Sequence, residues 1–181
     1  MKLSEIYSFL NELSPFELAA SWDNSGLMIG DKEGDIEQIY LSLEPTFDVL
    51  DSLEPNSLLI THHPLIFSPL KKVDFSSSVG KIIRLAIQKN ISVVAMHTNY
   101  DKTHLNVYFA TKVMGFKNIV KDGFLVYADV DIEFLELVES AKQKLGLQSV
   151  NCVEKSGRIN RVAVVTGSGA SFIGKVEADC L

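Results

Sequence analysis

The sequence predicts an α/β fold in which a mixed, largely parallel sheet is flanked by helices and the chain forms two lobes. Between residues 37 and 115, apolar runs alternate with segments of helical periodicity, as in strand-helix-strand proteins. The runs at 58–60 and 91–96 are almost continuously apolar, which is typical of parallel strands covered on both faces. The pattern changes near Asp122, where we place the boundary between an N-terminal lobe, 1–122, and a second lobe, 123–181.

The elements of the first lobe follow from periodicity and from residues that end helices. Apolar residues at helical spacing predict an opening helix that ends before Ser14 and Pro15, and a polar loop, SWDNSGLMIGDKEGD, comes next. Strands are expected at 39–43, 58–60 and 91–96. They alternate with helices at 46–53, at 79–87 closed by Asn90, and at 103–114 closed by Gly115.

The second lobe has fewer predicted elements. The segment 124–130 reads as a strand and 131–145 as a helix that ends at Gly146. A strand over 161–171 then enters a Gly-rich turn.

The charge balance limits the possible partners. Seventeen Lys and Arg against 23 Asp and Glu give a net charge of −6 and a pI near 5.2, which argues against binding nucleic acid or an anionic membrane by charge alone. No stretch approaches the roughly 18 apolar residues of a membrane span, and no signal peptide opens the chain, so we expect a cytoplasmic protein. The two cysteines, Cys152 and Cys180, fit no zinc or redox spacing and are expected to be buried or incidental thiols.

Histidines follow two of the predicted parallel strands, at the edge where open α/β sheets bind ligands. His62 and His63 follow the strand at 58–60, and His97 follows the strand at 91–96. Successive side chains of an extended backbone point to opposite sides, so the adjacent pair fits two neighbouring metal ions better than one shared ion. Asp101 can add a carboxylate oxygen, and this mixture of ligands suits Zn, Mn, Fe or Ni.

Other interpretations of these residues stay open at this point. A single pair of histidines is common, and Asp101 can simply cap a helix that begins near Thr103. His97 can be a ligand, a donor that orients a ligand, or a histidine satisfied at the strand end; we favour the orienting or substrate-facing role.

Two further segments are candidates for substrate binding. In the polar loop, Trp22 can stack on a base while Asp23 and Asn24 bind its edge, although an anchoring Trp in an Asx turn explains the pattern equally well. The turn Gly167, Ser168, Gly169 can form an anion nest for phosphate, although an ordinary strand-to-helix turn has the same composition.

Four motifs together resemble a known family. SWDNSGLMIGD, LLITHHPLIF, ISVVAMHTNYD and RVAVVTGSGASF occur in the order seen in the GTP cyclohydrolase 1 type 2 homologues, also called Nif-three-like proteins. The resemblance covers nearly the whole chain and implies the Nif-three-like fold. It also implies a ring-shaped homohexamer.

The resemblance also implies a dinuclear metal site. It assigns His62 to one metal ion, and His63 with Asp101 to the other. The family completes the site with a late histidine and a bridging glutamate, whereas no histidine follows His104 in this chain, so the chain is expected to be truncated relative to the family. Neither Glu177 nor Asp179 is expected to replace those ligands.

The leading functional hypothesis is a dinuclear divalent-metal-dependent hydrolase acting on a nucleotide-like substrate, with opening of the guanine ring of GTP suggested by the family name. His97 is the candidate for proton transfer, because histidine exchanges protons near neutral pH. Two alternatives remain: a metal-dependent phosphoesterase, and a metal-binding regulatory or interaction protein without turnover.

Overall fold

The computed structural model describes all residues from Met1 to Leu181 and divides into two compact units, Met1–Tyr100 and Asp101–Leu181. The sequence places the boundary later, near Asp122. The division falls earlier because the helical stretch after Tyr100 contributes Ala110 and Met114 to clusters with residues of the later strands. None of the helices combines the length and the apolar composition needed to cross a membrane.

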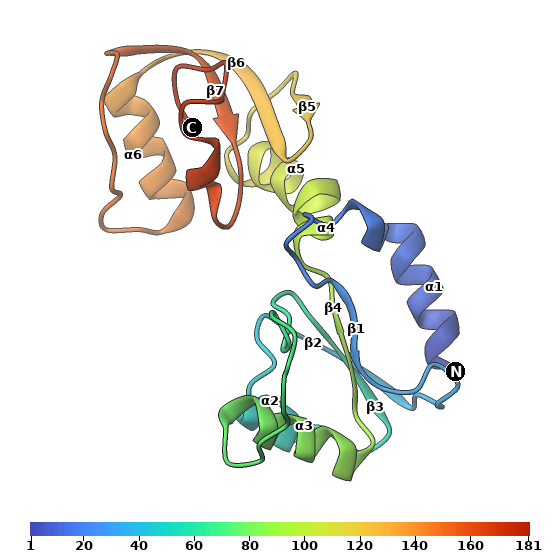
Figure 1. Cartoon of the computed structure of the whole chain (residues 1–181). Helices are drawn as coiled ribbons and strands as arrows, with labels where there is room; N and C mark the ends of the chain where they lie inside the picture. Colours follow the sequence, from blue (N-terminus) through green and yellow to red (C-terminus); the bar gives the residue numbers. More distant parts are fainter. The chain divides into compact units, whose positions relative to one another are not determined.

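The first unit contains a four-stranded sheet in the order β1-β4-β3-β2 (Figure 1). β2 (Gln38–Ser42), β3 (Ser57–Thr61) and β4 (Ser92–Ala95) are parallel, and β1 (Gly26–Ile29) pairs antiparallel with β4. The mixed, largely parallel sheet expected from the sequence is confirmed. The segment expected to be only a polar loop contains β1, which is too short for alternation to show.

Helices cover both faces of this sheet, as the continuous apolar strands predict (Figure 1). α1 (Leu3–Leu13) packs its buried side against Leu58 and Val94 on one face. α2 (Phe47–Ser52) and α3 (Ser78–Lys89) pack against Leu59 and Val93 on the other. Neighbouring residues of each strand thus enter different cores, and both β3 and β4 are buried almost throughout.

Local signals end the helices where the sequence indicates. Thr46 caps α2 by accepting a hydrogen bond from the Val49 amide (3.2 Å), and Asn90 closes α3 in the left-handed conformation (φ 54°). A short 3-10 helix, η1 (Phe16–Leu18), follows α1.

The second unit begins with a continuous helical stretch. α4 (Thr98–Tyr100), at the end of the first unit, leads into π-helical η2 (Asp101–Leu105), α5 (Asn106–Tyr108) and π-helical η3 (Phe109–Val113). The helix predicted from Thr103 therefore starts at Thr98, and Asp101 lies inside it. The interpretation of Asp101 as a cap preceding the helix is wrong for this reason.

An antiparallel sheet, β5-β6-β7, makes up the rest of the second unit with α6 (Figure 1). Its elements are β5 (Val120–Asp122), β6 (Leu125–Glu133), α6 (Phe134–Leu145), β7 (Arg158–Val164) and the 3-10 helix η4 (Gly169–Phe172). β6 runs on to Glu133, so α6 begins later than predicted and still ends at Gly146 (φ 65°). Cys152 is exposed and Cys180 half-buried, so neither thiol is fully buried.

Candidate metal centre

Three histidines meet where β3 and β4 end. His62 and His63 follow β3, and His97 follows β4 by two residues. One ligand atom from each histidine lies within 4.8 Å of the others, and the ring centroids are 5.0 to 5.5 Å apart. Because the strands are parallel and in register, their carboxyl ends bring these side chains to one edge of the sheet.

The histidine pair is not in extended conformation. β3 ends at Thr61, whose hydroxyl donates a hydrogen bond to the carbonyl of His63 (2.8 Å) and so closes a bend. The amides of His62 and His63 donate to the carbonyls of Ser42 and Leu43 after β2. Alternation of side chains therefore does not separate the two rings, and one ligand atom of each lies within 4.8 Å of the other. The number of ions held here stays a prediction.

Each histidine of the cluster places Nδ1 against an oxygen that can only accept a hydrogen bond. The partners are the Met96 carbonyl for His62 (3.0 Å), the Glu44 carboxylate for His63 (2.5 Å) and the Asp23 carboxylate for His97 (2.7 Å). Nδ1 must then carry a proton, and in the neutral ring the lone pair is on Nε2. This arrangement of acceptors behind the rings is the one that orients metal-binding histidines in proteins.

The side chain of Asp23 is buried beside His97. Its carboxylate is 0% exposed and accepts hydrogen bonds from the Thr98 amide (3.1 Å), the Ser25 hydroxyl (2.8 Å) and the ring of His97. Burial raises the pKa of Asp23, but the hydrogen bonds from His97, Thr98 and Ser25 outweigh it and lower the pKa to about 2. The carboxylate therefore faces His97, and its expected role at the edge of a base stays a prediction.

Asn24 and Trp22, the other two candidates in that loop, differ in their surroundings. The Asn24 side-chain amide donates to the Ile66 carbonyl (2.5 Å), so it joins two loops of the protein. Trp22 is 59% exposed, with its ring 6.0 Å from Phe67 and 6.3 Å from His97.

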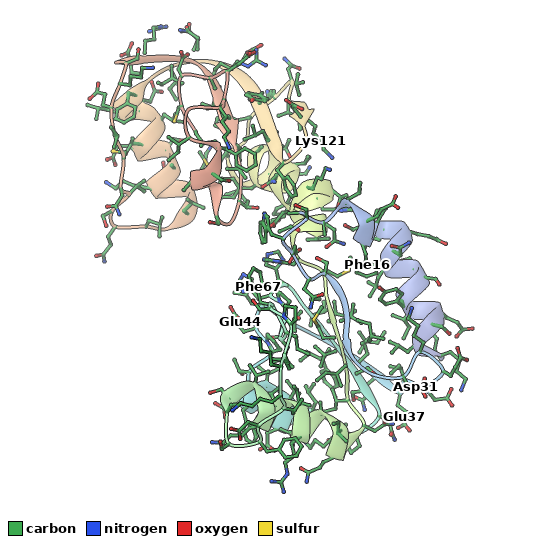
Figure 2. All side chains as sticks on the ribbon, viewed as in Figure 1. Phe16, Asp31, Glu37, Glu44, Phe67 and Lys121 are labelled. Carbon is green, nitrogen blue, oxygen red and sulfur yellow. The ribbon has the colours of Figure 1, made fainter.

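The sequence does not identify two residues of this region. Glu44 and Phe67, labelled in Figure 2, come from the loops after β2 and β3. Glu44 has no motif around it, and only its place after a parallel strand could have pointed to it. Phe67 ends the HHPLIF segment, where an apolar side chain in a surface loop was the available signal.

Asp101 and the Gly-rich turn lie in the second unit. Asp101 is buried and accepts a hydrogen bond from the Thr166 hydroxyl (3.2 Å). Gly167, in the Gly-rich turn after Thr166, has a positive φ of 71°. It lies next to Asp101, since an added Cβ on Gly167 would be 3.8 Å from the Asp101 carboxylate. The Gly169 amide, beyond Ser168, donates to the Gly167 carbonyl (3.0 Å), so this turn already uses one of the donors expected for phosphate. The assignment of Asp101 as a ligand stays a prediction.

The histidine cluster fits a divalent transition metal. Oriented imidazole nitrogens suit Zn, Mn, Fe or Ni better than Mg or Ca, which prefer oxygen. The three histidines alone provide donors for one ion, and a second ion requires further ligands.

Comparison with known proteins agrees with the motifs. A family model described as Duf34/NIF3 (NGG1p interacting factor 3) matches residues 1–181. The chain is 47% identical over 183 residues to a Campylobacter jejuni protein named GTP cyclohydrolase 1 type 2 homolog, with 99% of this chain and 75% of that protein covered. It is 45% identical over 181 residues to the GTP cyclohydrolase 1 type 2 of Helicobacter pylori (strain J99), covering 99% and 74%.

Solved structures support the same assignment. A hypothetical protein of Staphylococcus aureus superposes with a TM-score of 0.82 at 28% identity, over 97% of this chain and 75% of that one. A Bacillus cereus protein related to NIF3 has the same fold, with a TM-score of 0.79 at 18% identity over 97% and 79% of the two chains. The chain therefore belongs to the Duf34/NIF3 family, whose members include proteins named GTP cyclohydrolase 1 type 2.

Proposed function

We propose that this protein is a divalent-metal-dependent hydrolase that uses two metal ions to act on a nucleotide-like substrate. The observation that carries the proposal is the histidine cluster, in which every Nδ1 is paired with an oxygen acceptor. The names of the C. jejuni and H. pylori relatives supply the reaction we infer, opening of the guanine ring of GTP.

The histidine ligands in this proposal are His62 on one ion and His63 on the other. The acceptors behind the two rings hold them in place: the Met96 carbonyl fixes His62, and the Glu44 carboxylate fixes His63. When bound, divalent ions supply Lewis-acid activation of water near neutral pH and positive charge for phosphate. That charge matters because the chain carries a net charge of −6.

His97 is the residue we assign to proton transfer. The buried Asp23 carboxylate holds its Nδ1 proton, so Nε2 is the atom that accepts and returns a proton. The ring of His97 lies 5.2 and 5.5 Å from the rings of His62 and His63, and this proximity supports the proposed exchange.

The decisive experiment measures metal content per chain and GTP turnover in the same preparations. We expect wild-type protein to hold transition metal and release formate from GTP, and His62→Ala to lose both. His104→Ala is the matched control, because His104 is the one histidine outside the cluster. Turnover of simple phosphodiesters without formate release would favour the phosphoesterase alternative, and bound metal with no turnover would favour a regulatory metal-binding protein.

Assembly and location form part of the same proposal. We expect a homo-oligomer, a hexamer by family resemblance, in the cytoplasm. Light scattering coupled to size-exclusion chromatography measures the first expectation directly, and a monomer would contradict it.

A further inference from the structure

Two large aromatic side chains lie against each other in the first unit without being covered by the protein. Trp22 is 59% exposed and Phe67 is 50% exposed, and their ring centroids are 6.0 Å apart at an interplanar angle of 50°. They come from different loops, one before β1 and one after β3. Two exposed aromatic rings that lie side by side offer a surface that a ligand can cover.

The pair lies beside the histidine cluster. The Trp22 ring meets His97 edge-on at 6.3 Å, and His97 lies 5.2 and 5.5 Å from His62 and His63. A planar ring stacked on Trp22 would therefore lie on the side of the cluster that His97 occupies. An aromatic contact at this position can orient a substrate toward the metal centre.

Hydrogen bonds on both sides of the pair hold its loops in place. Asn24 donates its side-chain amide to the carbonyl of Ile66, so the loop that carries Trp22 is tied to the residue before Phe67. Asp23, the residue after Trp22, is fixed by Thr98 and Ser25. The two rings are thus positioned by bonds to their neighbours while about half of each side chain stays exposed, and this preorganisation reduces the entropy cost of binding.

We propose that Trp22 and Phe67 form a stacking site for the planar heteroaromatic ring of the substrate, of purine type. The inference rests on the proposed function in taking the histidine cluster as the reaction centre, and it deepens that function by assigning the recognition of the base. Aromatic stacking supplies affinity for a base without reading its edge. Recognition through Trp22 and Phe67 also agrees with the hydrogen bonds between Asp23 and His97 and between Asn24 and Ile66, which engage these two polar side chains within the protein.

The chain provides its own probe, because Trp22 is its only tryptophan. The experiment titrates metal-free protein in chelator with guanosine monophosphate, and separately with ribose 5-phosphate, and follows tryptophan fluorescence excited at the red edge of the band. We expect saturable quenching by guanosine monophosphate and none by ribose 5-phosphate. Equal responses to the two ligands would overturn the stacking site.

Phe67→Ala and Phe67→Leu test the second ring. Loss of one stacking partner should weaken guanosine monophosphate binding by roughly tenfold or more. Phe75→Ala is the matched control, since Phe75 is also 50% exposed in the same connection between β3 and α3 and lies against Arg84 instead. Unchanged affinity in both Phe67 variants, with melting curves like that of the wild type, would refute the site.

Failure of this inference and failure of the proposed function are distinguishable. Binding is measured without metal and without turnover, so quenching that depends on Phe67 supports the stacking site even if GTP is not converted. Conversely, GTP turnover that is lost in His62→Ala but has the same KM in Phe67→Ala as in the wild type contradicts the stacking site and leaves the hydrolase proposal intact.

Discussion

The carboxylate of Asp23 accepts a hydrogen bond of 2.7 Å from Nδ1 of His97, a residue 74 positions further along the chain. The bond joins the loop before β1 to the end of β4, and both side chains are largely inaccessible to solvent. It fixes which nitrogen of His97 carries the proton.

Asp23→Asn should lower kcat while metal content is kept. The amide has no charge and offers N–H donors beside its oxygen, so it no longer enforces the tautomer of His97. Loss of such a partner behind a functional histidine typically costs about 10- to 100-fold in activity. Steady-state kinetics and metal analysis of the purified variant measure both quantities.

Glu44→Gln provides the comparison for that variant. Glu44 accepts a hydrogen bond from His63 in the same way, but its side chain is 52% exposed. Water can replace the carboxylate there, so kcat should fall less in Glu44→Gln than in Asp23→Asn. If Asp23→Asn instead lost its metal, His97 would be a ligand and its assignment to proton transfer would be wrong.

Stability of the metal-free protein should fall in acid because of Asp23. Its folded pKa of about 2 lies below the ordinary 3.8, so the carboxylate contributes stability above about pH 4 and loses it as the pH falls toward 2. The contribution at neutral pH is on the order of 1–2 kcal/mol. Urea unfolding near pH 6 and near pH 3 should show a larger drop for wild type than for Asp23→Asn, and parallel drops would contradict it.

Leu59→Ala should destabilise the first unit by roughly 2–5 kcal/mol. Leu59 is fully buried on β3 in the cluster with Leu50 and Val93, so truncation leaves a cavity between the sheet and its helices. Leu41→Ala is the control, since Leu41 is 79% exposed on β2 and should change the unfolding free energy by less than about 0.5 kcal/mol. Denaturant unfolding of the two variants side by side provides the measurement.

Gly80→Ala should destabilise the start of α3. An added Cβ would lie 1.9 Å from the Asp74 carbonyl oxygen, which already accepts the hydrogen bond from the Ser77 amide in the turn before the helix. Relieving that overlap requires backbone movement, at a cost of about 1–3 kcal/mol.

Gly157→Ala is the matched control for that change, because its added Cβ meets only the Glu154 side chain at 3.9 Å. Equal thermal midpoints for Gly80→Ala and Gly157→Ala would contradict this prediction, because the turn at Asp74 would then rearrange without loss of stability.

Periodicity and helix-end signals predicted most elements of the first unit and the end of α6 in the second unit. Asn90 and Gly146 end α3 and α6 as expected, since left-handed conformations favour these residue types. β1 was missed because strand pairing, and not its four-residue sequence, defines it. The start of the helix at Thr98 was missed because local sequence does not show that the histidine loop closes directly into a helical turn.

For the site, chemistry was easier to predict than geometry. The types and order of His62, His63 and His97 indicated a metal centre at the strand ends. The bend after Thr61 and the pairing of Asp23 with His97 depend on long-range hydrogen bonds, which no local pattern encodes. Asp23 was consequently predicted to face substrate.

Hydrogen bonds of Met96, the first residue after β4, join the end of β4 to the end of β3. The Met96 amide donates to the Thr61 carbonyl (2.8 Å), and the Met96 carbonyl receives Nδ1 of His62 (3.0 Å). An ion held by His62 and its neighbours would bind the folded chain only, so its binding free energy would add to the cost of separating these two strands. Metal saturation should consequently slow amide hydrogen exchange in the middle of the sheet, at Leu59 and Val93, well away from the ligands themselves.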